Sequence, residues 1–200
     1  MEYNNLTSFQ LDALKEVSNI GAGNSATSLS ILLGTKIDMA IPNLNLIEFS
    51  ELFNDYKENT VVAVIVKVLE DIEGSVLYVF DEEVALNVIS KLTFKNESML
   101  SELGESVIGE IGNIIASAFM NAIADFTNLK ATASVPAVAN DMLNAILSSA
   151  FVETGQYEDY VLDIETLFKG EGEDNKIEGH FYFVPAPGSL EKILEALGIK

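Results

Sequence analysis

An internal repeat is the feature that most limits what this chain of 200 residues can fold into. Shifting the sequence against itself by 94 residues aligns segment 12–23 with segment 106–117. Neither half is flanked by a stretch rich in Pro, Gly or Ser, which would mark a linker between domains. We therefore expect one pseudo-symmetric domain over residues 1–200, built of two repeats at about 1–97 and 98–200.

The register of the repeat changes once along the chain. It continues without a gap through Pro42 and Pro136, but farther on Gly74–Phe80 matches Gly179–Pro185 at a shift of 105 residues. The second half therefore carries about eleven additional residues. We assign them to segment 138–147, whose apolar residues have helical spacing.

Both halves have the same order of expected elements. A long helix with apolar residues at helical spacing comes first, at about 8–33 and 98–126, followed by a strand that ends at a proline, a β-hairpin and a shorter helix. Tight turns join the hairpin strands, so we expect a mainly antiparallel sheet with helices packed on it, and the fold class α+β. The expected strands are Lys36–Ile41, Val61–Leu69, Gly74–Phe80, Lys130–Val135, Tyr160–Phe168 and Ile177–Val184, and the shorter helices are Asp81–Leu92 and Pro187–Leu197.

The composition excludes several classes of function. Asp and Glu number 31 against 11 basic residues, all of them Lys, and a net charge of -20 repels nucleic acids and anionic membranes. Without Arg or Cys the chain offers no guanidinium clamp for phosphate, no thiol nucleophile and no cysteine zinc site. His180 is the single histidine, and we expect it to be a structural or a surface residue. No leader sequence or membrane span is indicated, so we expect a cytoplasmic protein without membrane insertion.

Each long helix carries a polar stripe opposite its apolar stripe. An exposed helix face is polar in any case, and Glu is a good helix former. Asn is not, because its side chain competes for backbone hydrogen bonds, so an Asn three residues after Glu in both helices is hard to explain by solubility. The stripes are Asp12, Glu16, Asn19 and Gly23 in the first helix, and Ser106, Glu110, Asn113 and Ser117 in the second.

The pattern Asp/Ser-x3-Glu-x2-Asn-x22-Pro, present twice, resembles the signature of the CheC/CheX/FliY family of chemotaxis phosphatases. The order of elements in both halves also fits that family. The resemblance implies an enzyme of two-component signalling, a protein phosphatase that hydrolyses the phospho-aspartate of the response regulator CheY. The two copies of the pattern are Asp12, Glu16, Asn19 and Pro42, and Ser106, Glu110, Asn113 and Pro136.

The residues suit this chemistry. Hydrolysis of an acyl phosphate needs an in-line water, a divalent cation and positive charge near the phosphoryl oxygens. The regulator can supply its own Mg²⁺ and Lys, so we expect no metal or cofactor on this chain. An amide stays neutral beside a phosphoryl group that would repel a carboxylate, so we assign Asn19 and Asn113 to position the attacking water. Glu16 and Glu110 would dock the regulator, and the supporting residues are Asp12, Ser106, Gly23, Pro42 and Pro136, the prolines by ending their strands.

The resemblance also implies binding of the receptor deamidase CheD. The expected contact surface is segment 138–147, with Asp141 and Asn144 on its polar face and its apolar face against the sheet. The alternative is a satellite helix that only covers a sheet edge. The expected partners are phosphorylated CheY and CheD, and the expected state is a monomer or a heterodimer with CheD.

Two other classes of function stay open. A non-catalytic adaptor would bind the phosphorylated regulator and CheD without turnover, although it would have no need for an Asn at both sites. A metal-dependent hydrolase would use the many carboxylates of the chain, although neither stripe groups enough ligands.

Overall fold

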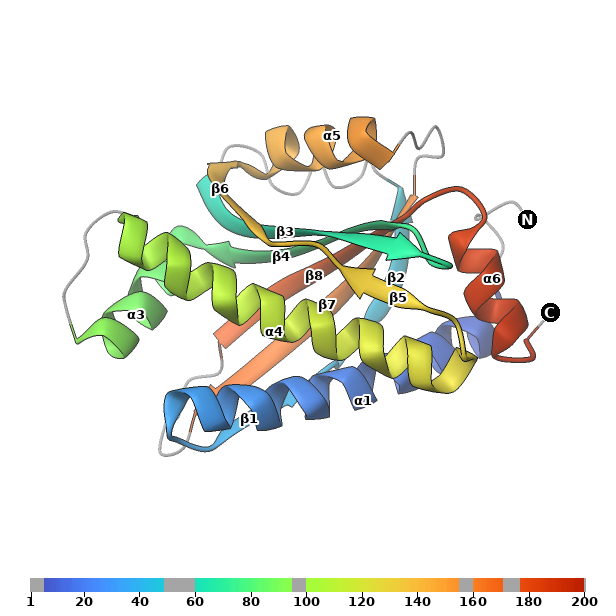
Figure 1. The fold of residues 1–200 in the computed structure, drawn as a ribbon, viewed down its shortest axis with the longest axis horizontal. Helices are drawn as coiled ribbons and strands as arrows, with labels where there is room; N and C mark the ends of the chain where they lie inside the picture. Colours follow the sequence, from blue (N-terminus) through green and yellow to red (C-terminus); the bar gives the residue numbers. More distant parts are fainter. Residues whose placement is uncertain (1–5, 49–59, 95–99, 155–159, 171–176, 200) are drawn as a thin grey trace.

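One eight-stranded sheet, with helices on both faces, forms the molecule (Figure 1). The computed structural model describes residues 6–48, 60–94, 100–154, 160–170 and 177–199. All strand pairs are antiparallel, so the α+β prediction is confirmed. The expected boundary between the repeats, at residues 97 and 98, lies outside the described residues. The strands are β1 Ile37–Ala40, β2 Leu44–Glu48, β3 Thr60–Glu70, β4 Gly74–Asp81, β5 Ala131–Ala133, β6 Ala137–Met142, β7 Tyr160–Gly170 and β8 Ile177–Pro185.

The two long helices begin at equivalent positions of the repeat. α1 spans Ser8–Leu33 and α4 spans Glu102–Thr127. The hydroxyls of Thr7 and Ser101, which are 94 residues apart, accept backbone N–H groups of the first turns and so satisfy helix donors that would otherwise lack partners. The shorter helices are α3 Glu82–Thr93, α5 Leu143–Thr154 and α6 Ser189–Ala196.

The strand pairing reproduces the repeat as an approximate two-fold symmetry. β1 and β2 both pair with β7, and β5 and β6 both pair with β3 in the same sense. β4 and β8 pair with each other at the centre of the sheet. Because each half pairs with strands of the other half, neither repeat completes its edge of the sheet alone.

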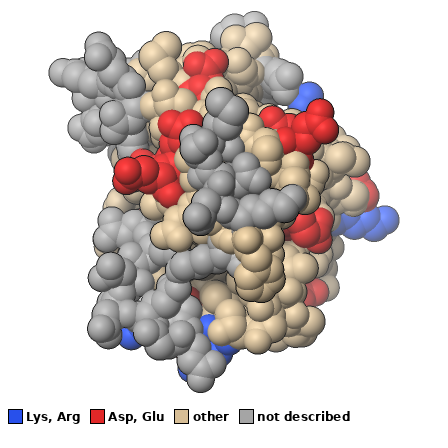
Figure 2. Space-filling model, turned by 90° about the vertical axis from the view of Figure 1, so that its left-hand side faces the viewer, with Lys and Arg blue, Asp and Glu red and all other residues tan. Residues whose placement is uncertain are grey.

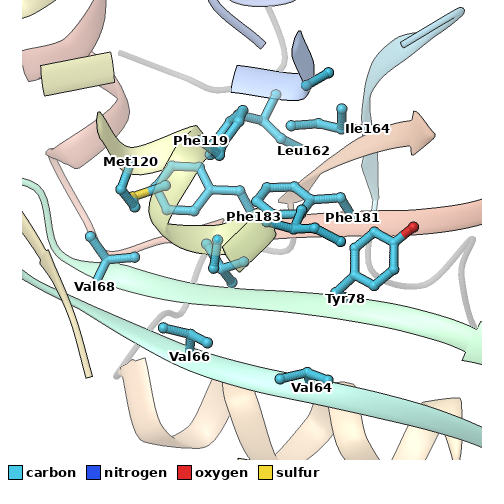
Figure 3. Packing of buried hydrophobic residues seen from close by; sticks show 14 of the residues in the cluster. Val64, Val66, Val68, Tyr78, Phe119, Met120, Leu162, Ile164, Phe181 and Phe183 are labelled. Atoms are coloured by element: carbon cyan, nitrogen blue, oxygen red, sulfur yellow. The ribbon is translucent and has the colours of Figure 1, made fainter. Parts of the chain in front are cut away.

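Side chains on the two faces of the sheet form two apolar clusters. The first lies between the sheet and the helices α1, α3, α4 and α6, and it contains Phe119 and Met120 of α4 and Phe181 and Phe183 of β8 (Figure 3). The second lies between the opposite face and α5. At about 25 cal/mol per Å² of apolar surface, the many fully buried aromatic and branched side chains supply most of the favourable folding energy.

The sequence prediction for segment 138–147 is wrong in part. Residues 138–142 belong to strand β6, and only Leu143 begins the helix α5. β6 is the equivalent of β2 at the original shift of 94 residues, so this part is not an addition to the second repeat. β3 begins at Thr60 and β7 at Tyr160, a shift of 100, so additional residues lie after β6 instead. The first-half stretch that would correspond to α5, residues 49–59, lies outside the described residues.

Glycines let the long helices approach their neighbours closely. A side chain at Gly112 would put its Cβ 2.5 Å from the Val64 side chain on β3, and one at Gly21 would lie 2.9 Å from the Phe119 backbone on α4. Neither distance is possible for real atoms in contact. α4 is also the one described helix that is long and apolar enough to cross a membrane, but 61% of its most apolar window is buried inside the fold, as in the core helix of a soluble protein.

Candidate functional site

The polar stripe of α1 lies at the surface beside the turn between β1 and β2. Asp12, Glu16 and Gly23 are exposed, and Asn19 is half-buried. Among the described residues, nothing lies within 4 Å of a Cβ placed at Gly23. A side chain at Gly23 would therefore meet no described residue, and packing among the described residues gives no reason for a glycine there.

Two side chains of α1 hold the turn that follows β1. The side-chain oxygen Oδ1 of Asn19 accepts a hydrogen bond from the backbone N–H of Ile41 at 3.3 Å. One helical turn earlier, Lys15 Nζ donates to the carbonyl oxygen of Pro42. The signature residues Asn19 and Pro42 therefore meet through this turn, which is how the structure connects them.

The helix and strand lengths explain the 22-residue spacing between Asn19 and Pro42. The helix from Asn19 to Leu33 covers about 21 Å at about 1.5 Å per residue. The chain turns at Gly34, which is left-handed, and the return from Lys36 to Pro42 covers about 20 Å at about 3.3 Å per residue. The outward and return paths match, so the proline comes back to the turn of helix that carries the amide.

The stripe of α4 forms a second site with different contacts. Ser106 and Glu110 are exposed, and Asn113 and Ser117 are half-buried. The Ser106 hydroxyl donates to the carbonyl of Glu102 within its own helix. The side chain of Asn113 forms no hydrogen bond with any described residue.

The surroundings of Asn113 account for this difference. Gly109 occupies the position equivalent to Lys15, so the second site has no ammonium group there. Val135, the equivalent of Ile41, is 88% exposed, whereas Ile41 is 5% exposed. Pro136 follows in the turn between β5 and β6, as Pro42 does between β1 and β2. The sequence motif is repeated, but the hydrogen bond from the turn to the amide is not.

The two sites lie apart because α1 and α4 run antiparallel beside each other (Figure 1). Each Glu and Asn stands in the N-terminal half of its helix, and the helices contact each other near Gly21 and Phe119. Each site thus has its own surface for a partner.

Exposed carboxylates lie at both sites, those of Asp12 and Glu16 on α1 and that of Glu110 on α4. Carboxylates are also spread over the end of the molecule that Figure 2 shows, which is the left-hand side of Figure 1, and lysines lie at its margin. Neither Glu16 nor Glu110 has an ion pair within the described residues, so both carboxylates are available to a basic group of a partner. The described residues contain no group of three or more His, Asp or Glu side chains arranged to hold a metal ion.

The residues expected to contact CheD do not share a helix face. Asp141 is exposed in β6, and its carboxylate accepts the backbone N–H of Met142 at 2.7 Å. Asn144 lies in the first turn of α5 and is half-buried, and its Oδ1 is buried with no hydrogen-bond partner in the described part of the chain. The two side chains flank the junction between β6 and α5 instead of forming one helical stripe.

The fold of this chain is similar to that of a solved structure. The crystal structure of Thermotoga maritima FliY superimposes with a TM-score of 0.81 over 96% of this chain and 98% of that chain, at 21% identity.

Sequence comparisons identify the family. A model of the CheC-like family matches residues 9–46 and 103–139, which include both stripes. The CheY-P phosphatase CheC of Bacillus subtilis is 32% identical over 203 residues, 98% of this chain and 97% of that protein. The flagellar motor switch phosphatase FliY of the same organism is 31% identical over 131 residues, 66% of this chain and 32% of that protein. This chain belongs to the CheC-like family.

Sequence reasoning missed Lys15 and the backbone of Ile41. Lys15 lies four residues before Asn19, so it shares a helix face with the amide, but a single Lys on a half-exposed helix carries no signal of its own. Every residue except Pro has a backbone N–H, so the residue types do not show which N–H group bonds the amide. Both contacts depend on where β1 ends, which only the fold specifies.

Proposed function

We propose that this chain is a phosphatase that removes phosphate from the phospho-aspartate of phosphorylated CheY. The observation that carries the proposal is the paired site: an exposed Glu and an Asn one turn later, at equivalent depth in two helices. The names of the relatives, a CheY-P phosphatase and a motor switch phosphatase, support the same substrate. The whole-chain match to CheC makes the support stronger than a local motif would.

In the proposed mechanism the amide positions the attacking water. Mg²⁺ and a Lys on the regulator would neutralise the phosphoryl charge, because this chain has no Arg and its described part brings together no three His, Asp or Glu side chains that could hold a metal ion. One lone pair of Asn19 Oδ1 is used by Ile41, which leaves the second lone pair and both Nδ2 hydrogens for the water. Holding the water in line supplies the entropic part of the rate acceleration.

Glu16 and Glu110 would dock the regulator. Each is exposed, without an ion pair in the described structure, and one turn from its Asn. Pairing with a regulator Lys would place the phosphoryl group over the amide. Because a single exposed ion pair contributes little binding energy, its main effect would be to orient the regulator as it approaches the site.

The direct test measures inorganic phosphate released from phosphorylated CheY, with and without this protein, at a fixed Mg²⁺ concentration. We expect release to accelerate in proportion to the concentration of this protein. The control replaces the regulator by a free acyl phosphate, which offers no docking surface and is expected to hydrolyse at its own rate. An unchanged rate for phosphorylated CheY, with binding intact, would favour the adaptor.

CheD binding is proposed for the junction of β6 and α5. Asp141 offers an exposed charge there, and the half-buried Asn144 lies three residues farther on, in the first turn of α5. We expect Asp141→Lys with Asn144→Ala to weaken CheD affinity about tenfold while phosphate release is retained. Asn87→Ala, an exposed change on α3, is the control. Unaltered CheD affinity would contradict this surface.

A further inference from the structure

The turn after β1 is held from both sides, and the turn after β5 is not. On the sheet side, the carbonyl of Asn43 accepts the N–H of Glu165 at 3.1 Å, and the Asn43 side chain donates to the Glu165 carboxylate at 2.6 Å. On the helix side, Lys15 and Asn19 bond to the backbone of the same turn. The segment Ile41–Asn43 is therefore fixed between α1 and β7.

In the described part of the chain, the equivalent turn of the second repeat is hydrogen-bonded to the sheet and not to its helix. Ser134 and Lys67 exchange two hydrogen bonds: the N–H of Ser134 donates to the Lys67 carbonyl at 2.9 Å, and the N–H of Lys67 donates to the Ser134 hydroxyl at 3.0 Å. No bond of a described residue joins Asn113 to this turn, and Gly109 has no side chain to do so.

We propose that Lys15 is a positioning residue of the first site, a role that rests on the phosphatase function proposed above. By holding the Pro42 carbonyl, the ammonium group fixes the N–H of Ile41 against Asn19 Oδ1. The amide is then held in one orientation before the regulator arrives. An ammonium–carbonyl hydrogen bond is charge-assisted and stronger than a neutral one, so the lysine is suited to this task.

The physical consequence is a preorganised amide. A half-buried Asn with one hydrogen bond already made has fewer rotamers to lose when the water and phosphoryl group bind. Loss of Lys15 would free the turn and let the amide rotate. Turnover at the first site would fall, whereas docking through Glu16 would be unaffected, since no hydrogen bond or ion pair of a described residue joins that carboxylate to the turn.

The kinetic test isolates the first site in an Asn113→Ala background and then changes Lys15 to Met, which keeps the length of the side chain. We expect kcat to fall about tenfold with KM changed less than about twofold. Lys15→Arg is expected to restore at least a third of the rate, because a guanidinium can also donate to a carbonyl. A double-mutant cycle with Asn19→Ala should show that the two losses are not additive, since one acts through the other.

The matched control is Lys192→Met. Lys192 also donates to a backbone carbonyl, that of Asp71 at 3.1 Å, but it joins α6 to the turn between β3 and β4 and contacts no site residue. We expect its kcat to equal that of the background. A rise in KM at constant kcat for Lys15→Met would show a docking role and overturn the positioning role, as would an unchanged rate.

A measurement without turnover separates this inference from the phosphatase function. Amide hydrogen exchange at Ile41 should be slow in the full chain and about tenfold or more faster in Lys15→Met, with no change in Lys192→Met. If Ile41 exchanges equally in all three proteins, Lys15 does not hold the turn, whatever the phosphatase assay shows. If exchange responds as expected and the wild-type chain releases no phosphate from phosphorylated CheY, the proposed function fails and, with it, the catalytic role of the turn. If the wild-type chain is active and the Asn113→Ala parent is not, the first site is not catalytic and Lys15 has no catalytic role.

Discussion

The turns that follow β1 and β5 occupy equivalent positions in the two repeats and differ in the hydrogen bonds that hold them. In the first repeat Lys15 and Asn19 bond the turn, and Ile41 is buried beside them. In the second, Gly109 replaces the lysine and Val135 is exposed. The two-fold symmetry of helices and strands thus carries two chemically different sites.

The difference indicates how a duplicated fold can diverge without losing its core. Side chains that pack between the helices and the sheet must fit both neighbours, so changes there are costly. A surface turn tolerates the change from the buried Ile41 to the exposed Val135, because few atoms depend on it. The repeats can therefore keep one architecture and vary the rigidity of each amide.

The largest expected effect comes from removing both amides. Asn19→Ala with Asn113→Ala should reduce accelerated phosphate release from phosphorylated CheY by about 100-fold or more, because no group then orients the water. Both side chains are only half-buried, so the fold should be retained, as circular dichroism would verify. The loss of activity in each single variant would measure how much of the phosphate release its site contributes. A folded double variant with wild-type turnover would contradict the water-positioning role at both sites.

A stability experiment probes the packing beneath the two sites. Gly112→Ala should lower the free energy of unfolding by about 1–3 kcal/mol, because the added methyl group overlaps Val64. The equivalent residue of α1 is Ser18, which is buried and donates to the Leu14 carbonyl, so the first helix accommodates a side chain there. Gly23→Ala is the control, expected to cost nothing in urea unfolding since its Cβ would meet no described atom. Equal stability of Gly112→Ala and the parent would mean that α4 lies no closer to the sheet than α1.

Charge reversal compares docking at the two sites. Glu16→Lys and Glu110→Lys should each weaken binding of phosphorylated CheY at its own site by about tenfold, since a regulator Lys would meet a like charge. The maximal rate at saturating regulator should change less. The measurement is the titration of rate against regulator concentration in the background that lacks the other Asn. A lowered maximal rate with unchanged affinity would assign these carboxylates to the chemistry instead.

The smallest effect concerns a polar pair present in one hairpin only. His180 of β8 bonds Asp163 of β7 at 3.1 Å. The strand registers put Leu77 and Ala63 at the equivalent positions of the first hairpin, so β4 and β8 are related by a shift of 103 residues and not by the 105 expected from the sequence. Burial opposes the charged imidazole, but the hydrogen bond and charge of Asp163, with the charges of Glu165 and Asp81, raise the pKa of His180.

Because the pKa of His180 is raised in the folded state, the contribution of this residue to stability should decrease as pH rises. The charged His180 stabilises the folded state fully below its unfolded pKa of about 6.5, and this stabilisation is lost as pH rises through the folded value. The difference in unfolding free energy between the parent and His180→Gln should therefore shrink between about pH 6 and pH 8. Urea unfolding at both pH values measures it, with Asp163→Asn as the matched partner change. A difference that grows with pH would contradict this assignment.

Sequence reasoning predicted the elements that depend on local pattern. The long helices, both hairpins and the shorter helices α3 and α6 lie where apolar spacing and turn residues predicted them. It failed at segment 138–147, because the residues before Leu143 extend as β6 beside β3 and do not form a helix. Pairing with a distant strand decides between the two conformations, and a local window does not contain that strand.

What the sequence by itself determined is the repeat, the fold class and the two Glu–Asn pairs, since helical spacing fixes which residues share a face. Only the tertiary structure decided that Lys15 holds the Pro42 turn, that Asn19 is bonded while Asn113 is not, and that Gly112 is in contact with β3. These facts depend on distances between segments far apart in the chain. Such distances result from packing of the whole core, and no residue type encodes them alone.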